Sequence, residues 1–143
     1  MTQFQLQYKS KRNDLLAAVT ANSGYDSEKI IINKLAYIKN EPERNDVIVF
    51  CQSKTGHGYY NIKRVIGLPG ETVQIIDGYV CINGEQLDEH YGREVIEEDR
   101  YGLAAEPIKL GKDEYFVLGD NRNHSSDSRE PNVGVLHRDE LIG

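Results

Sequence analysis

The chain has 143 residues and a formal net charge of -6, a length that fits one domain with room for a small appendage. The acidic balance excludes a nucleic-acid surface and disfavours an anionic membrane surface, because phosphate groups are bound by clustered Lys and Arg. Hydrophobic residues make up 38% of the sequence and charged residues 28%, so most of the chain is expected to fold.

The N-terminal region is predicted to form an arm over residues 1–28, ahead of a β core over residues 29–143. Within this arm, "QFQLQY" alternates like a strand, whereas "RNDLLAAVTA" predicts a helix over residues 12–21 that Asn13 or Asp14 caps. An arm of this kind is able to exchange between two copies of the chain, which would give a swapped dimer.

β signals dominate from residue 29 onward. The runs "KIIINKLAYI" and "NDVIVFCQS" predict two strands, because β-branched and aromatic residues cluster over strand length. Three further β-rich runs follow, separated by Pro69-Gly70, Asp77-Gly78 and Asn83-Gly84. Asp-Gly and Asn-Gly supply the positive φ values that tight hairpin turns need, so these runs predict a meander.

The remainder of the chain completes the expected core. Residues 85–113 are acidic and weakly periodic, which predicts a small irregular excursion rather than more sheet. "EYFVLG" then resumes the strand pattern, and "VGVLHRDELIG" closes the chain with apolar residues and a polar turn. The predicted fold class is mainly β, with an antiparallel, coiled or barrel-like core.

Cysteines and histidines are too few and too scattered to indicate a metal site. Cys51 and Cys81 lie thirty positions apart and form no CxxC pair, so both are interpreted as small core residues or unpaired thiols, with a single bridge as the alternative. The histidines show no close pairing, and we expect no metal and no cofactor. They are His57, His90, His124 and His137.

Lys63 and Arg64 are adjacent on a predicted strand, so their side chains point to opposite faces. One of the two basic groups therefore faces inward. Burying an ammonium group costs several kcal/mol unless it is paired or loses its proton, which makes an inward lysine a candidate general base with a lowered pKa. The alternative is an edge strand on which both side chains reach water.

The stretch "GDNRNHSSDSR" follows a strand and a glycine turn, and it is dense in charges and hydroxyl groups. An ion pair between Asp127 and Arg129 would pin this loop and leave Ser125 available to orient another group. The alternative interpretation is a solvated polar loop.

Taken together, "NDVIVF", "YYNIKRVIGLPGETV" and "GDNRNHSSDSR" resemble bacterial type I signal peptidase, a membrane-anchored serine protease with a Ser/Lys dyad. The resemblance implies that Lys63 is the general base and that Ser125 hydrogen-bonds this lysine. It further implies supporting structural roles for the loop residues Asp120, Arg122, Asp127 and Arg129.

The nucleophile motif of that family, Gly-x-Ser-Met-x-Pro-Thr, is absent, because the only methionine is Met1 and the first proline is Pro42. The best fit places Gly24, Tyr25 and Asp26 at the Gly-x-Ser positions, so that Asp26 replaces the nucleophilic serine.

This replacement would change the chemistry. A carboxylate within about 4 to 6 Å of Lys63 raises the pKa of the lysine and leaves an ion pair where a neutral base is required. Ser23 and Ser27 are the alternative nucleophiles, and the structural alternative for Ser27 is a simple turn residue.

The resemblance also implies a cleft in which an extended peptide adds as a β-strand, held by main-chain hydrogen bonds. The expected peptide-binding residues are Ser23, Gly24 and Tyr25 on one side and Tyr60, Asn61 and Ile62 on the other.

These observations lead to two hypotheses. The first is a non-catalytic signal-peptidase-like protein that binds an extended segment of a secreted or pilin-type protein and assists pilus assembly in Gram-positive cocci, in a sortase-dependent system. The second is an active type I signal peptidase with an aberrant nucleophile loop. Both imply an N-terminal membrane anchor beyond the present sequence and a location at the outer face of the membrane.

Overall fold

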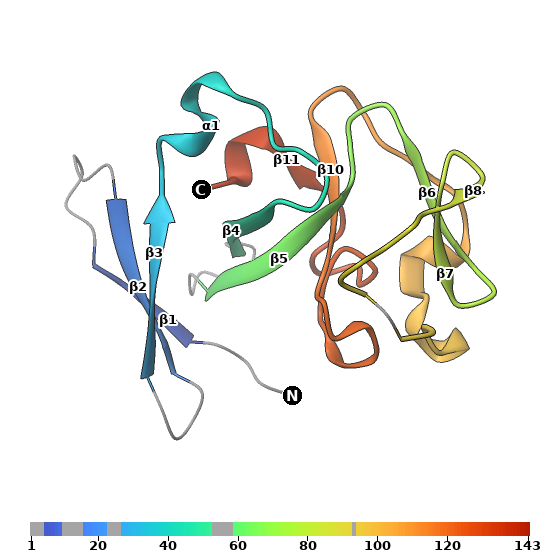
Figure 1. The fold of residues 1–143 in the computed structure, drawn as a ribbon, viewed down its shortest axis with the longest axis horizontal. Helices are drawn as coiled ribbons and strands as arrows, with labels where there is room; N and C mark the ends of the chain where they lie inside the picture. The colour runs from blue at the N-terminus through green and yellow to red at the C-terminus, as the bar shows by residue number, and fades with distance from the viewer. Residues whose placement is uncertain (1–4, 10–15, 23–26, 53–58, 93) are drawn as a thin grey trace.

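The computed structural model describes the chain except residues 1–4, 10–15, 23–26, 53–58 and 93. Its strands pair in antiparallel fashion and form three sheets (Figure 1). The predicted fold class is confirmed as mainly β and antiparallel, although the three sheets do not join into one closed barrel within the described residues. The division of the chain at residue 28 stays a prediction.

The N-terminal sheet has the strand order β1-β2-β3. Its strands are β1 (Gln5–Lys9), β2 (Leu16–Asn22) and β3 (Ser27–Asn33). The strand predicted from "QFQLQY" is therefore confirmed, whereas the helix predicted over residues 12–21 is wrong where the structure describes it. β2 is the central strand and pairs with a neighbour along each edge, and this pairing outweighs the helix propensity of its Leu and Ala residues.

The second sheet has the order β11-β10-β5-β4. Its strands are β4 (Val47–Gln52), β5 (Tyr59–Gly67), β10 (Glu114–Leu118) and β11 (Leu136–His137). The strand predicted from "KIIINKLAYI" ends early, at Asn33, and the short helix α1 (Ala36–Lys39) follows. The Asn33 side chain accepts a hydrogen bond from the Leu35 backbone N–H, which turns the chain out of the strand.

The third sheet has the order β8-β7-β6-β9. Its strands are β6 (Thr72–Ile76), β7 (Tyr79–Ile82), β8 (Glu85–Gln86) and β9 (Ile108–Lys109). The predicted hairpin turns are confirmed, because Asp77 and Gly78 have φ values of 52° and 85° and Asn83 and Gly84 have values of 53° and 85°. Both central residues of each turn are thus left-handed, as a type I′ turn requires.

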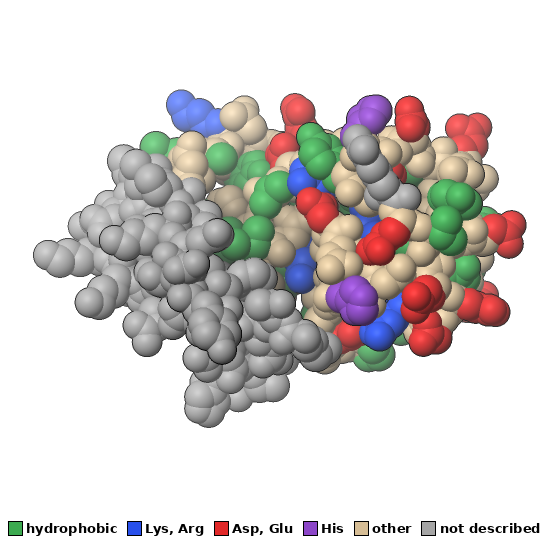
Figure 2. Space-filling model, turned by 60° about the horizontal axis from the view of Figure 1, so that its bottom comes forward, with side chains coloured by type: hydrophobic (Ala, Val, Ile, Leu, Met, Phe, Trp, Pro, Cys, Tyr) green, Lys and Arg blue, Asp and Glu red, His purple; other side chains and the backbone are tan. Residues whose placement is uncertain are grey.

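Residues 85–113 hold only short elements. Besides β8 and β9 they form the 3-10 helices η1 (Glu98–Arg100) and η2 (Gly102–Ala105). Two further 3-10 helices, η3 (Arg122–His124) and η4 (Arg138–Glu140), follow β10 and β11. Figure 2 shows Asp and Glu side chains gathered around the right-hand end of the molecule, where Figure 1 places β6, β7 and this excursion.

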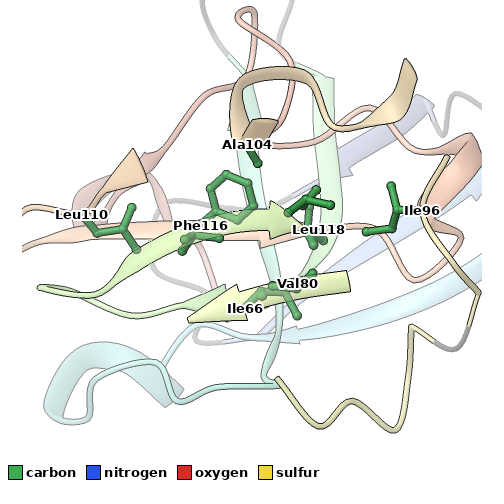
Figure 3. Packing of buried hydrophobic residues seen from close by; sticks show 9 residues of the cluster. Ile66, Val80, Ile96, Ala104, Leu110, Phe116 and Leu118 are labelled. Carbon is green, nitrogen blue, oxygen red and sulfur yellow. The ribbon is translucent and has the colours of Figure 1, made fainter. Parts of the chain in front are cut away.

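β10 and the C-terminal end of β5 are buried on both faces, between two hydrophobic clusters. On β10, Phe116 and Leu118 belong to the cluster drawn in Figure 3, whereas Tyr115 and Val117 belong to the other cluster. On β5, Ile66 and Val65 divide in the same way. The alternation of strand side chains explains the continuous apolar runs in these segments, and the two clusters support the β5–β10 pair from both sides.

The two cysteines are free thiols, as predicted, with Cys81 buried and Cys51 half-buried. Among the described helices, none has the length and apolar character that crossing a bilayer requires.

Candidate active site

The loop after β10 begins at Gly119 and lies against β5. β10 pairs with β5 in antiparallel register, with Leu118 opposite Arg64. The end of β10 therefore brings residues 119–129 beside Lys63, although some sixty residues separate them in the sequence. The resulting site is made of one strand residue and one loop, both supported by the buried strand pair.

Lys63 and Arg64 point to opposite faces of β5, and each finds a partner in this loop. Lys63 Nζ lies 3.1 Å from Ser125 Oγ, within hydrogen-bonding distance. Burial lowers the pKa of Lys63 below its ordinary value of 10.5, and the nearby negative charge of Asp127 opposes this shift in part. A partly desolvated lysine held by a hydroxyl group is suited to accept a proton.

Asp127 and Arg129 form a buried ion pair that pins the loop. Arg129 Nε and Nη2 each lie 2.8 Å from a carboxylate oxygen of Asp127, whose side chain is 0% exposed. Arg129 Nη2 also donates to the backbone carbonyl of Arg122 at 2.7 Å, and its Nη1 donates to that of Arg100 at 3.0 Å. Since all these groups belong to bends and short helices, the pair replaces the backbone hydrogen bonds that regular structure would supply.

Asp120 and Arg122 each pair with a residue outside the loop. Arg64 donates two hydrogen bonds of 2.8 Å to the Asp120 carboxylate, and these bonds hold the pKa of Asp120 below its usual range. Arg122 makes a two-pronged pair with Glu89 of the excursion, at 2.6 and 2.8 Å. The Arg122 side chain is 1% exposed, so this second pair is a buried one.

Gly119 is a residue of the site that the sequence reasoning missed. A Cβ atom at this position would lie 2.0 Å from Ser125 Oγ and 3.5 Å from Lys63 Nζ, so only a glycine allows the two side chains to meet. The signal was the glycine turn that opens "GDNRNHSSDSR", which sequence reasoning treats as a bend rather than as a contact surface.

Several predicted residues stand apart from this geometry. Ser23, Gly24, Tyr25 and Asp26 lie outside the described residues, and Ser27 is known only as the first residue of β3. The proposed nucleophile and one side of the peptide cleft therefore stay predictions.

The other side of the predicted cleft lies on β5. Tyr60, Asn61 and Ile62 directly precede Lys63, and their register partners on β4 are Cys51, Phe50 and Val49. These three residues therefore share a strand with the lysine, and their role in peptide binding stays a prediction.

The arrangement defines a class of site. A half-buried lysine with a lowered pKa, oriented by a hydroxyl group on a mainly β scaffold, suits hydrolases that use lysine as the general base for a hydroxyl nucleophile.

The chain belongs to the signal peptidase family, peptidase S26, whose family model matches residues 16–143. It is 38% identical over 122 residues to the probable signal peptidase I-2 of Synechocystis, and 41% identical over 123 residues to the signal peptidase I of Leptolyngbya laminosa. It is also 36% identical over 124 residues to signal peptidase I T of Bacillus subtilis. These matches cover 82% to 83% of the chain and 52% to 63% of the relatives, so the chain spans little more than half of their length.

A solved structure agrees with the sequence relatives. The crystal structure of a signal peptidase I from Enterococcus faecalis V583 matches with a TM-score of 0.56 and 34% sequence identity. The match covers 73% of the present chain and 96% of that chain.

These comparisons correct the first functional hypothesis. A non-catalytic protein of pilus assembly was predicted, mainly because the Ser-Met-x-Pro motif is missing. Eight relatives that are 30% to 41% identical over most of the chain are instead each named a signal peptidase I or a probable one. The missing motif concerns a few residues near the N-terminus, whereas Lys63 lies within hydrogen-bonding distance of Ser125 and Asp127 pairs with Arg129 in the loop after β10.

Proposed function

We propose that the chain is the catalytic part of a type I signal peptidase, an endopeptidase that cleaves signal peptides from exported precursors. The observation that carries this proposal is the 3.1 Å contact between Lys63 Nζ and Ser125 Oγ, at a lysine whose pKa burial lowers. Family membership over residues 16–143 supports it.

In the proposed reaction, neutral Lys63 accepts the proton of a serine hydroxyl while the hydroxyl oxygen attacks the scissile carbonyl carbon. The C–N bond then breaks, and the lysine returns the proton to the leaving amine. Water hydrolyses the resulting ester in a second round of the same proton transfers. Ser125 orients the lysine, and the buried pair of Asp127 and Arg129 holds the loop that carries Ser125.

The proposed nucleophile lies within residues 23–27, a segment that departs from the family pattern because the chain contains no Ser-Met-x-Pro sequence. Ser23 and Ser27 are the two serines of this segment, and Asp26 lies between them. The proposed substrate is an extended segment of a secreted precursor that adds as a strand beside Tyr60, Asn61 and Ile62 of β5.

Cleavage of a signal-peptide substrate in detergent, followed by mass spectrometry of the products, tests the proposal. We expect turnover that Lys63→Ala abolishes and that Glu106→Gln, an exposed change on the excursion, leaves intact. Ser23→Ala, Ser27→Ala and Asp26→Asn then identify the nucleophile, since one serine variant should lose all activity. Turnover that persists in Lys63→Ala would refute the proposal, and so would a complete lack of cleavage.

The proposal also includes membrane attachment, with the catalytic part at the outer face. Fractionation of cells that express the full gene product, combined with protease treatment of intact spheroplasts, tests this. Digestion from the outside is the expected result, and protection of the chain in intact spheroplasts would contradict it.

A further inference from the structure

Gly119 is held at both ends by charged groups that water does not reach. Its backbone N–H donates to Asp127 Oδ2 at 3.0 Å, and its carbonyl oxygen accepts a hydrogen bond from Arg122 Nε at 3.1 Å. Asp127 is 0% exposed and Arg122 is 1% exposed. Because Gly119 lies directly against Ser125 Oγ, these two bonds fix the surface on which Lys63 and Ser125 meet.

Asp127 and Arg122, the two residues that hydrogen-bond the Gly119 backbone, each belong to an ion pair. Asp127 is paired within the loop, by Arg129. Arg122 is paired by Glu89, which lies in the excursion thirty-three residues earlier in the chain. The two oxygens of the Glu89 carboxylate bind the two terminal nitrogens of the guanidinium, which leaves Nε directed at the Gly119 carbonyl.

The excursion is shaped to lie against this guanidinium. A Cβ atom at Gly92 would lie 2.2 Å from Arg122 Cζ, so the glycine lets the backbone pass flat over the charged group. Asn123 adds two bonds from the loop to the excursion, since its side chain accepts from Glu97 N at 2.9 Å and donates to the Val95 carbonyl at 3.1 Å. Hydrogen bonds and an ion pair thus join the excursion to the active-site loop.

We propose that Glu89 is a positioning residue for the Lys63–Ser125 pair, which it controls by holding Arg122 against the Gly119 carbonyl. Glu89 reaches neither Lys63 nor Ser125 and acts only through Arg122 and Gly119. The proposal rests on the proposed function for its effect on cleavage, although its effect on Lys63 exists without cleavage. The proposal gives the acidic excursion a role in the active site that the sequence of residues 85–113 does not indicate.

The decisive variant is the double change Glu89→Leu with Arg122→Met. Replacement of both members of a buried ion pair by apolar residues of similar size leaves stability close to that of the original protein. It nevertheless removes the Arg122 Nε–H that donates to the Gly119 carbonyl. We expect the melting temperature to fall by several degrees, because the Gly119 carbonyl loses its donor, and we expect kcat for signal-peptide cleavage to fall by about tenfold to a hundredfold with KM retained.

The matched control is the double change Arg44→Met with Glu71→Leu. Arg44 and Glu71 also form a two-pronged pair, at 2.5 and 3.0 Å, and Arg44 Nη1 also donates to a backbone carbonyl, that of Ile66, at 2.5 Å. This pair braces the turn after β5 and has no contact with Gly119. The control should keep its kcat, so a loss confined to the Glu89 and Arg122 variant separates positioning from general stability.

A second readout does not depend on cleavage. The pH dependence of Lys63 acylation by acetic anhydride, followed by peptide mass spectrometry, reports the titration of the amine. In the Glu89 and Arg122 variant the midpoint should move up toward that of an ordinary lysine, because water reaches a loosened site. Should the double variant fail to fold, Gly92→Ala keeps both charges and displaces the guanidinium, and the same upward shift is expected.

The outcomes separate the two proposals. If the unchanged chain cleaves no precursor but the variant still moves the Lys63 midpoint, the proposed function fails and the positioning role stands. If the unchanged chain cleaves and the folded variants match the control in kcat and in Lys63 titration, the positioning role of Glu89 is refuted and the proposed function stands.

Discussion

Gly119→Ala is the smallest change that should separate Lys63 from Ser125. The added methyl carbon would lie 2.0 Å from Ser125 Oγ and 2.5 Å from Ser125 Cβ, whereas carbon and oxygen atoms in contact are about 3.5 Å apart. The backbone at Gly119 does not need a positive φ, so the effect comes from the methyl group alone. Ser125 must therefore move by roughly 1 Å or more, which is enough to break its 3.1 Å bond to the lysine.

The expected cost to catalysis follows from that displacement. A shift of about 1 Å in a positioning group lowers the rate about a hundredfold, which corresponds to about 2.7 kcal/mol in the activation free energy. Overpacking should also lower the free energy of unfolding by about 1 to 3 kcal/mol. Signal-peptide cleavage measures the first quantity and urea denaturation the second.

The control for this variant is Gly111→Ala. Its new methyl group would meet the flexible Glu114 side chain at 3.2 Å, far from the lysine, so kcat should stay unchanged. A Gly119→Ala variant that folds and retains the original kcat would show that contact between Ser125 and Lys63 is not needed for turnover.

Three further predictions test the electrostatics of the site. Because burial lowers the pKa of Lys63, the pH profile of kcat/KM should rise through a midpoint below 10.5. Between that midpoint and 10.5 the unfolded chain binds more protons than the folded chain, so the free energy of unfolding should rise with pH in this interval. Urea titrations should show this rise, and Lys63→Met should abolish it. Asp127→Asn leaves Arg129 charged and buried without its partner, which should cost about 3 to 5 kcal/mol of unfolding free energy in urea denaturation. Asp120→Asn breaks a pair whose carboxylate side chain is 48% exposed, so it should cost less than about 1 kcal/mol by the same measurement, and a larger loss would contradict this estimate.

The hairpins of the third sheet were predictable because the information is local. Asp77-Gly78 and Asn83-Gly84 specify the turn by their own backbone preferences, and the structure gives all four residues positive φ values. The opposite faces of Lys63 and Arg64 were predictable for the same reason, since strand alternation needs only two neighbouring residues.

The N-terminal elements were not predictable in this way. Residues 16–22 contain Leu and Ala, which favour a helix, and become a strand only because β1 and β3 supply hydrogen-bonding partners on both edges. The short helix at Ala36–Lys39 follows a strand that a single asparagine side chain ends. Both outcomes depend on contacts that a window of sequence does not contain.

The partner of Arg122 illustrates the same limit within the site. The excursion offers many carboxylates at similar positions, and composition gives no reason to choose Glu89 among them. Glu89 becomes the partner because Gly92 permits the chain to approach the guanidinium of Arg122. Asn123 also holds the excursion in place, through hydrogen bonds to the backbone of Val95 and Glu97. A buried arginine on a loop must have a counter-charge, so its presence signals that a partner exists but does not identify it.

Three sets of contacts, here called layers, hold Lys63 and Ser125 in place, and they join residues at different separations along the chain. The strand pair β5–β10 places Lys63 beside Gly119, the ion pair of Asp127 with Arg129 shapes the loop locally, and Glu89 closes it from a distant segment. Burial lowers the pKa of Lys63, and we expect this burial to depend on all three layers. A change in any layer should consequently shift the titration of the lysine, and a change that leaves a buried charge unpaired, such as Asp127→Asn, should lower the stability of the fold as well.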